Sequence, residues 1–266
     1  MNASAAPPVP HPLPSPLRWI AVWRRNVLVW QKLLVPSLLS NFGEPLLYLL
    51  ALGYGLGQFI DRMEGVPYLA FLASGLVCSS AMNTASFEGM YSGYTRMAVQ
   101  RTWDAMLAAP LDISDVVVGE AMWGATKSLV NSSAVLIVAL ALGAVASPWA
   151  PLALPVVFLT GLCFASLALV ITTLARSYDF FLYYTAVVVT PLLLLSGVFF
   201  PLDQMPAAIQ WGAHCFPLAH AVALVRPLLL DGETSPWLWG HLLVLLGYTA
   251  LALAVATTLA RRRLAS

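Results

Sequence analysis

The sequence predicts an all-α membrane protein with six transmembrane helices, and three observations support this fold class. Apolar residues make up 60% of the 266 residues and charged residues only 9%, whereas a soluble domain carries about 25% charged residues. The mean hydropathy is +0.81. Several stretches of about 20 residues or more, enough to cross a bilayer, contain no Asp, Glu, Lys or Arg. These features exclude an ordinary soluble domain and a disordered chain.

The N-terminal residues 1–16 are expected to form a disordered tail. Six prolines in this stretch prevent a helix. No basic region precedes an apolar core there, so a cleaved signal peptide is not expected.

Residues 17–32 predict an amphipathic helix that lies in the membrane interface. Four apolar residues fall on one stripe: Ile20, Trp23, Val27 and Trp30. Three basic residues recur every seven positions and project to the opposite side: Arg18, Arg25 and Lys32. Tryptophan and basic residues on opposite faces are typical of interfacial helices.

The transmembrane domain is expected to span residues 33–263. Its six crossings are predicted at residues 37–60, 66–88, 118–146, 152–175, 180–200 and 236–260. The longest charge-free stretch, residues 128–175, would form a helix of about 72 Å, more than twice the thickness of a bilayer core. This stretch must fold back, and Pro148 and Pro151 mark the break.

Residues 204–225 also lack charge and would be long enough for a seventh crossing. Pro206, Pro217 and two histidines favour instead a broken, half-inserted hairpin with short helices near 204–213 and 217–229.

The basic residues decide between six and seven crossings. With six, both termini lie on one side together with ten of the 13 basic residues, while only Arg62 and Arg226 lie on the other side. Lys127 falls within the third crossing. Positive residues concentrate on the cytoplasmic side, so both termini are predicted to be cytoplasmic.

Ionisable and aromatic residues near the crossings are candidates for a translocation pathway. The ionisable ones are Glu44, Glu88, Glu120 and Lys127. Exposure of such a residue to lipid costs about 3 kcal/mol or more at the bilayer centre. Each should therefore face a partner or an aqueous path. Glu120 and Lys127 are seven residues apart and share a helix face. Tyr48 and Tyr54 lie near the outer end of the first crossing, where interfacial aromatic residues are also common.

The chain shows no set of residues for catalysis or metal binding. Its four histidines and three cysteines have no ligand spacing, so no metal site is expected. The stretch from Gly119 to Ser128 superficially resembles a phosphate loop, but Lys127 comes two residues too late and lies in a membrane helix. A net charge of +1 gives no indication of nucleic-acid binding.

Two segments resemble the permeases of the ABC-2 type transporter family. The first segment, residues 101–120, is similar to the family's coupling helix and the start of its third crossing. It begins Arg-Thr-Trp-Asp-Ala-Met-Leu-Ala-Ala-Pro-Leu-Asp and ends at Gly119-Glu120. Residues 195–206, Leu-Ser-Gly-Val-Phe-Phe-Pro-Leu-Asp-Gln-Met-Pro, resemble its fifth crossing and external hairpin. Phe87-Glu88-Gly89, Arg101-Thr-Trp103 and Gly119-Glu120 look most like the nodulation protein J branch, whose members export lipo-oligosaccharides.

The resemblance implies a membrane-spanning subunit of an ATP-driven exporter in the bacterial inner membrane. Two copies would form the pore, and two separate ATPase subunits would carry ATP and Mg, with no cofactor on this chain. The cargo would be an amphipathic, lipid-linked oligosaccharide or polysaccharide. The helix around residues 96–111 would dock on the ATPase through Arg96, Arg101, Trp103, Leu107, Pro110 and Leu111. Pro201, Pro206, Pro217 and Arg226 would belong to the external hairpin.

Three other functions make different demands on the sequence. A hydrophobic drug exporter of the same fold is compatible with the sequence. An ion-coupled secondary transporter would show repeat-related acids and broken helices at the midplane, and no internal repeat is visible. A membrane-embedded enzyme would need a convergent His, Cys or acidic cluster, and none is visible.

Overall fold

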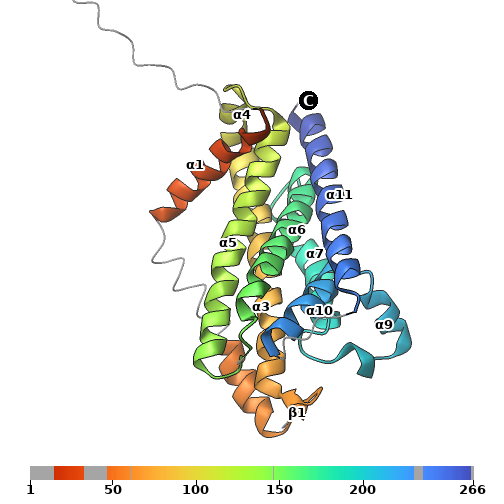
Figure 1. Cartoon of the computed structure of the whole chain (residues 1–266). Coiled ribbons are helices and arrows are strands. Elements are labelled where there is room, and N and C mark those ends of the chain that lie inside the picture. The colour runs from red at the N-terminus through yellow and green to blue at the C-terminus, as the bar shows by residue number, and fades with distance from the viewer. Residues whose placement is uncertain (1–14, 33–46, 61, 146, 231–235, 265–266) are drawn as a thin grey trace, which may run out of the picture.

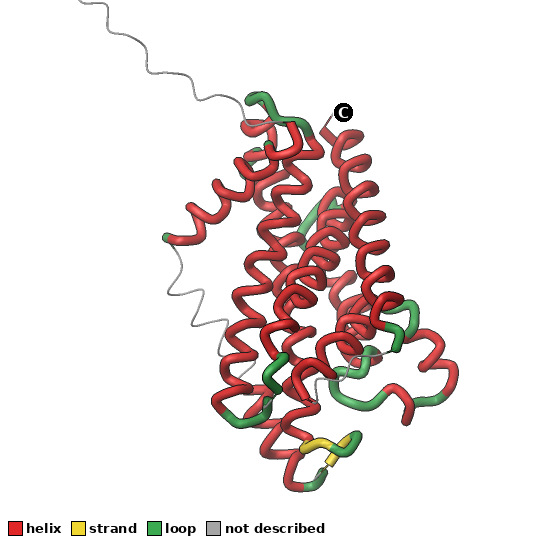
Figure 2. The backbone as a smooth tube through the Cα atoms, viewed as in Figure 1, coloured by secondary structure: helices red, strands yellow, loops and turns green. Residues whose placement is uncertain are grey.

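The computed structural model describes residues 15–32, 47–60, 62–145, 147–230 and 236–264. These residues are mostly helical, with a single short pair of strands (Figure 2). Helices α1 and α4 and the C-terminal end of α11 lie at one end of the molecule, which we call the α4 end, while strand β1 lies at the other end, the β1 end (Figure 1).

Four helices within the described residues are long and apolar enough to cross a membrane: Tyr68–Val99, Ile113–Ala141, Ala150–Leu174 and Leu238–Leu264. The first comprises α3 (Tyr68–Phe87) and two π-helical turns, Glu88–Ser92 and Thr95–Val99. The others are α5 (Ile113–Ala141), α6 (Ala153–Leu174, after a 3-10 turn at Ala150–Leu152) and α11 (Leu238–Leu264). They correspond to the predicted second, third, fourth and sixth crossings.

The predicted fifth crossing is a shorter apolar helix, Asp179–Leu195. It consists of α7 (Asp179–Tyr184), a π-helical turn (Thr185–Val189) and α8 (Thr190–Leu195). For the predicted first crossing, residues 37–46 lie outside the described part of the chain, and residues 47–58 are helical, with a π-helical stretch at Leu49–Tyr54. The total of six crossings stays a prediction.

The predicted hairpin between the last two crossings has two helices close to the expected positions. They are α9 (Ala207–Ala213) and α10 (Pro217–Leu230), and the chain bends by 87° between them. The proline at the start of α10 explains the bend, because it has no N–H to continue a preceding helix. Such a bend is the geometry of a broken or re-entrant membrane segment.

The prediction of a helix around residues 96–111 is wrong in its bounds. Residues up to Val99 belong to the long helix that begins at Tyr68. The chain then reverses at Arg101, whose φ of +50° is left-handed, and α4 spans only Thr102–Leu107. Few arginines adopt this conformation, so neither propensity nor periodicity marks the break. The helix that contains the predicted second crossing, residues 66–88, continues to Val99.

The N-terminal helix α1 (Trp19–Gln31) packs along α5. Its most buried residues are Val22 and Asn26. Trp23 Nε1 donates a hydrogen bond to Thr126 Oγ1 (2.9 Å). The packed face is therefore rotated relative to the predicted stripe, because Ile20 and Val27 are only half-buried. The predicted tail, residues 1–16, lies outside the described residues except for a 3-10 turn that starts at Ser15.

Small residues allow the helix Tyr68–Val99, α5 and α6 to approach closely. A Cβ atom added to Gly89 would lie 2.6 Å from Ala168 Cβ, and one added to Gly124 would lie 2.8 Å from Ala165 Cβ. Close contact of this kind is how helices associate in lipid, where tails compete equally for apolar side chains. These three helices form the centre of the molecule.

Gly119 makes a first prediction possible. A Cβ atom at this position would lie 2.6 Å from Val22 Cβ and 2.8 Å from the Trp19 carbonyl oxygen. We expect Gly119→Val to push α1 away from α5, because backbone atoms cannot yield as a flexible side chain would. Limited proteolysis measures this: trypsin should cleave after Arg24, which is exposed on α1, faster in the Gly119→Val protein than in the wild type. The control Gly247→Val changes a helical glycine with no neighbour within 4 Å. An unchanged cleavage rate in the Gly119→Val protein would contradict the packing.

Candidate functional site: a buried ion network near α4

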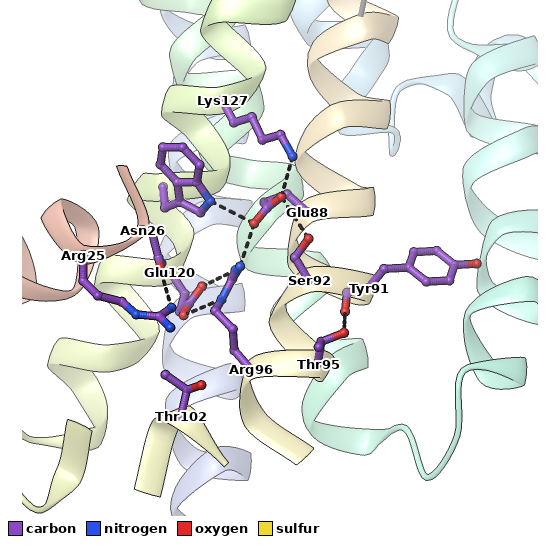
Figure 3. Close-up of polar contacts among 12 residues, drawn as sticks. Arg25, Asn26, Glu88, Tyr91, Ser92, Thr95, Arg96, Thr102, Glu120 and Lys127 are labelled. Atoms are coloured by element: carbon purple, nitrogen blue, oxygen red, sulfur yellow. Dashed lines mark hydrogen bonds and ion pairs between the residues drawn. The ribbon is translucent and has the colours of Figure 1, made fainter. Parts of the chain in front are cut away.

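Four ionisable side chains meet inside the helix bundle near the α4 end (Figure 3). Glu88 and Arg96 come from the long helix that begins with α3, and Glu120 and Lys127 come from α5. Arg96 bridges both acids, with Nη1 2.9 Å from Glu88 Oε1 and Nη2 2.5 Å from Glu120 Oε2. Lys127 Nζ lies 2.7 Å from Glu88 Oε2. We call these four residues the ion network.

The ion network is buried and has no net charge. The side chains of Glu88 and Glu120 are 3% and 1% exposed, and those of Arg96 and Lys127 are 12% and 23% exposed. The Arg96 guanidinium binds Glu120 through two nitrogens, because Nε also donates to Oε1 at 3.0 Å. Two acids and two bases in this geometry offset the cost of burying each charge alone.

The sequence positions the four residues by two different spacings. Glu120 and Lys127 are seven apart on a regular α-helix and therefore share a face, as predicted. Glu88 and Arg96 are eight apart, and the π-helical turns between them turn both side chains toward α5. Such π turns are frequent at functional sites because they realign side chains in this way.

Two buried indole groups complete the hydrogen bonding. Trp123 Nε1 donates to Glu88 Oε1 at 2.8 Å, and Trp103 Nε1 donates to Glu120 Oε1 at 3.3 Å. Ser92 Oγ donates to Glu88 Oε2 at 3.1 Å. Every carboxylate oxygen of the two acids therefore has a donor. Trp103 is fully buried, so it connects α4 directly to the ion network.

A cavity of about 280 Å³ separates the ion network from α1. Arg25 and Asn26 line it from α1, and Trp123 and Lys127 line it from α5. Burial and the nearby positive charge of Arg96 lower the pKa of Arg25 below its usual value, while Glu120 acts in the opposite direction. Movement of α1 would therefore change the electrostatic surroundings of the ion network.

The arrangement pairs the four charges with one another. Each carboxylate oxygen of the two acids accepts at least one hydrogen bond, and both acids are ion-paired. Within the part of the chain that the structure describes, no three His, Cys, Asp or Glu side chains form a metal site. The ion network joins three elements: the long helix that begins with α3, helix α4 and helix α5.

The six residues predicted for ATPase docking fall into two groups. Arg96 and Trp103 point into the protein, so the expectation that they lie on a docking surface does not fit their placement. Arg101 and Pro110 are exposed, and Leu107 and Leu111 are half-buried. The sequence could not distinguish these groups, because the reversal at Arg101 decides which side of α4 faces inward.

The residues predicted for the translocation pathway also lie in different parts of the structure. Glu88, Glu120 and Lys127 meet in the ion network, where each forms an ion pair, one of the two alternatives that the sequence left open. Tyr48 and Tyr54 are 42% and 51% exposed and belong to the helical residues 47–58, which pack against α3. Glu44 lies outside the described residues.

Sequence reasoning missed Trp123 and Ser92 as members of the site. A signal was present, because Trp123 follows Glu120 by three residues and Ser92 follows Glu88 by four, both on shared helix faces.

The residues predicted for the external hairpin differ in their exposure. Pro201 and Pro217 are buried, Pro206 is exposed, and Arg226 is largely buried against Phe71.

Comparison with known proteins gives a consistent result. The family model of the ABC-2 type transporter matches residues 17–230. Nodulation protein J of Rhizobium leguminosarum bv. viciae is 48% identical over 250 residues, which cover 93% of this chain and 95% of that protein. Nodulation protein J of Rhizobium meliloti (strain 1021) is 45% identical over 248 residues, covering 92% and 94%. The inner membrane transport permease YadH of Escherichia coli (strain K12) is 26% identical over 220 residues, covering 79% and 83%.

Proposed function

Because the chain belongs to the ABC-2 type transporter family, we propose that it is the permease of an ATP-driven exporter of a lipid-linked oligosaccharide, polysaccharide or lipo-oligosaccharide. The relatives named nodulation protein J support the choice of cargo. Two copies would form the translocation path in the inner membrane. ATP and Mg would bind to two separate ATPase subunits.

The distribution of basic residues supports a cytoplasmic position for the α4 end. Arg101 borders α4, and Arg261, Arg262 and Arg263 end α11 at the same end of the molecule. Arg62, in β1, lies at the opposite end. Positive residues near membrane helices favour the cytoplasmic side, so both chain ends would be cytoplasmic and the α9–α10 hairpin would face outward.

The connection of α4 to the ion network is the observation that carries the proposed coupling. The exposed side of α4 includes Asp104 and Ala105, and this side would contact the ATPase. Its buried side holds Trp103, which reaches Glu120. Displacement of α4 by the ATPase would therefore move the ion network. The long helix that begins with α3, and α5, would move with it.

The candidate pathway residues take different parts in this proposal. Glu88, Glu120 and Lys127 would serve as structural connectors, because their ion pairs leave no carboxylate oxygen free for cargo. Tyr48 and Tyr54, exposed on the segment next to α3, and Glu44 remain the candidates for contact with cargo.

The docking role of α4 predicts a clear result in a pull-down experiment. The tagged chain, extracted in mild detergent from its native membrane, should bring down an ATPase in equal amount and hydrolyse ATP. We expect Ala105→Trp to weaken this association at least about tenfold, equivalent to 1.4 kcal/mol, because a large side chain would separate the docked surfaces. The amount of ATPase recovered per permease, measured by quantitative mass spectrometry, gives the answer.

Ala207→Trp provides the matched control, since Ala207 is exposed on α9 at a distance from α4. It should leave recovery of the ATPase unchanged. A wild-type chain that purifies alone, or only with itself, would overturn the exporter proposal. It would favour the ion-coupled transporter instead, for which Glu44→Gln is the next variant to assay.

A further inference from the structure

A second cavity, of about 400 Å³, lies near the β1 end. One side is formed by the hairpin of β1 (Arg62–Met63) and β2 (Val66–Pro67), a second by the loop that follows α8, and a third by α10. Its polar lining comes from Glu64, Ser196, Asp203 and Arg226. None of these residues belongs to the ion network or to α4.

Arg226 lies largely buried at this cavity with part of its guanidinium unused. Nε donates to Ser74 Oγ at 3.0 Å, and Nη2 donates to the Gly197 carbonyl oxygen at 2.7 Å. The guanidinium carbon lies 3.7 Å from the centre of the Phe71 ring. Among the described residues no carboxylate forms an ion pair with Arg226, and no hydrogen-bond acceptor is found for Nη1. A guanidinium can donate five hydrogen bonds, so donors remain for a ligand.

Ser196 is an independent indication of a ligand in the same cavity. This serine has no solvent exposure, and its Oγ has no hydrogen-bond partner among the described residues. A buried hydroxyl without a partner is costly and needs an explanation, which a bound ligand or water can supply. Ser196 lines the same cavity as Arg226, and its hydroxyl is a second polar group there without a partner.

The loop that carries Ser196 is held by close contacts on two sides. Gly197 has a φ of +76°, a conformation that favours glycine. A Cβ atom on Gly75 of α3 would lie 2.6 Å from the Val198 carbonyl oxygen. The loop therefore rests directly on the α3 backbone, and Arg226 holds it from the other side. A polar group on a rigid support loses little entropy on binding.

The charges around the cavity indicate the kind of ligand. One cation, Arg226, is combined with two exposed carboxylates, Glu64 and Asp203. The two acids would repel an anion, and Arg226 would repel a cation. Hydrogen-bond donors and acceptors without an excess of either charge suit a ligand rich in hydroxyl groups. Apolar walls from Val66, Val222 and Leu230 can contact the C–H faces of a sugar ring.

We propose that this cavity binds one uncharged sugar unit of the cargo, through Arg226 and Ser196. The proposal rests on the proposed function, because it deepens the cargo assignment to a defined subsite. In the proposed orientation the subsite lies on the outer side, next to the α9–α10 hairpin, where the sugar part of an amphipathic cargo would leave the protein.

The test measures sugar binding to the full chain in lipid nanodiscs, together with any ATPase that co-purifies. The probe is tetra-N-acetylchitotetraose, an uncharged oligosaccharide, and inorganic sulfate is the anionic comparison. Isothermal titration calorimetry should show binding of the sugar and none of sulfate. We expect Arg226→Gln to raise the Kd for the sugar at least tenfold.

Two further variants control for misfolding and for charge. Ala223 lines the cavity on α10, so Ala223→Phe fills the space while leaving the contacts of Arg226 in place, and it should raise the Kd to a similar extent. Arg62→Gln removes an exposed positive charge from β1 at the same end and should leave the Kd unchanged. The melting temperature of each variant shows whether it is folded.

Each outcome decides the question. Wild-type protein that binds no sugar, or that binds sulfate instead, overturns the sugar subsite, and so does a folded Ala223→Phe protein with unchanged affinity. If the ATPase co-purifies in those same samples, only the subsite fails. Absence of the ATPase from wild-type samples counts against the proposed function itself.

Discussion

Replacing Arg96 by Met is expected to lower the free energy of unfolding by about 3–5 kcal/mol, the usual cost of removing one partner from a buried ion pair. Arg96 is the residue that bridges both acids of the ion network. Without it, Glu120 keeps only the hydrogen bond from Trp103 and the longer-range attraction of Arg25, while Lys127 remains paired with Glu88. Unfolding of the purified protein in a series of SDS concentrations measures the loss.

A second substitution separates charge from packing. Arg96→Met combined with Glu120→Gln should recover part of the lost stability, because a neutral amide needs no cation. Arg96→Lys should be intermediate, since lysine keeps the charge but cannot bind Glu120 through two nitrogens. If Arg96→Met unfolds at the wild-type SDS concentration, the ion network contributes nothing to stability and this interpretation is wrong.

Replacing Trp103 by Ala is expected to release α4 and to uncouple ATP hydrolysis from the permease. Truncating a fully buried tryptophan costs about 3–5 kcal/mol. Helix α4 spans only Thr102–Leu107, and a helix this short is not stable without tertiary contacts. Arg101, exposed beside it, is a site for trypsin. Cleavage after Arg101 should therefore become much faster in the Trp103→Ala protein.

Trp103→Phe is the matched variant. It keeps most of the buried volume and removes the N–H that reaches Glu120 at 3.3 Å, so we expect a loss of only about 1 kcal/mol and slow cleavage. The same preparations report on coupling: ATP hydrolysis by the complex should fall with Trp103→Ala and persist with Trp103→Phe. Cleavage of Trp103→Ala at the wild-type rate would show that α4 is held by other contacts.

Much of the helix arrangement could be predicted from where charge is absent. The break near Pro148 and Pro151 divides α5 from α6, because a single helix there would be far longer than a bilayer is thick. Pro206 precedes α9 and Pro217 begins α10, because a proline lacks the N–H that would continue a preceding helix. These features depend on the residue types within a short stretch of the chain, and these can be read from the sequence.

The rest depends on contacts between distant parts of the chain. Glu88 and Lys127 are 39 residues apart, and no local pattern pairs them. The left-handed Arg101 and the π-helical turns near Glu88 are stabilised by the packing around them, so propensity does not reveal them. The inward face of α1 is likewise set by Gly119 on α5, which admits Val22.

The pairing within the ion network also bears on how the chain enters the membrane during synthesis. Glu88 and Arg96 lie on one continuous helix, so this helix can neutralise its own buried acid before any later segment emerges from the ribosome. α5 carries Glu120 and Lys127 seven residues apart, too far for a close pair along one helix. Because translation starts at the N-terminus, the helix with its own ion pair is synthesised before α5. It is therefore already in the membrane when α5 enters with charges that need a partner on another helix.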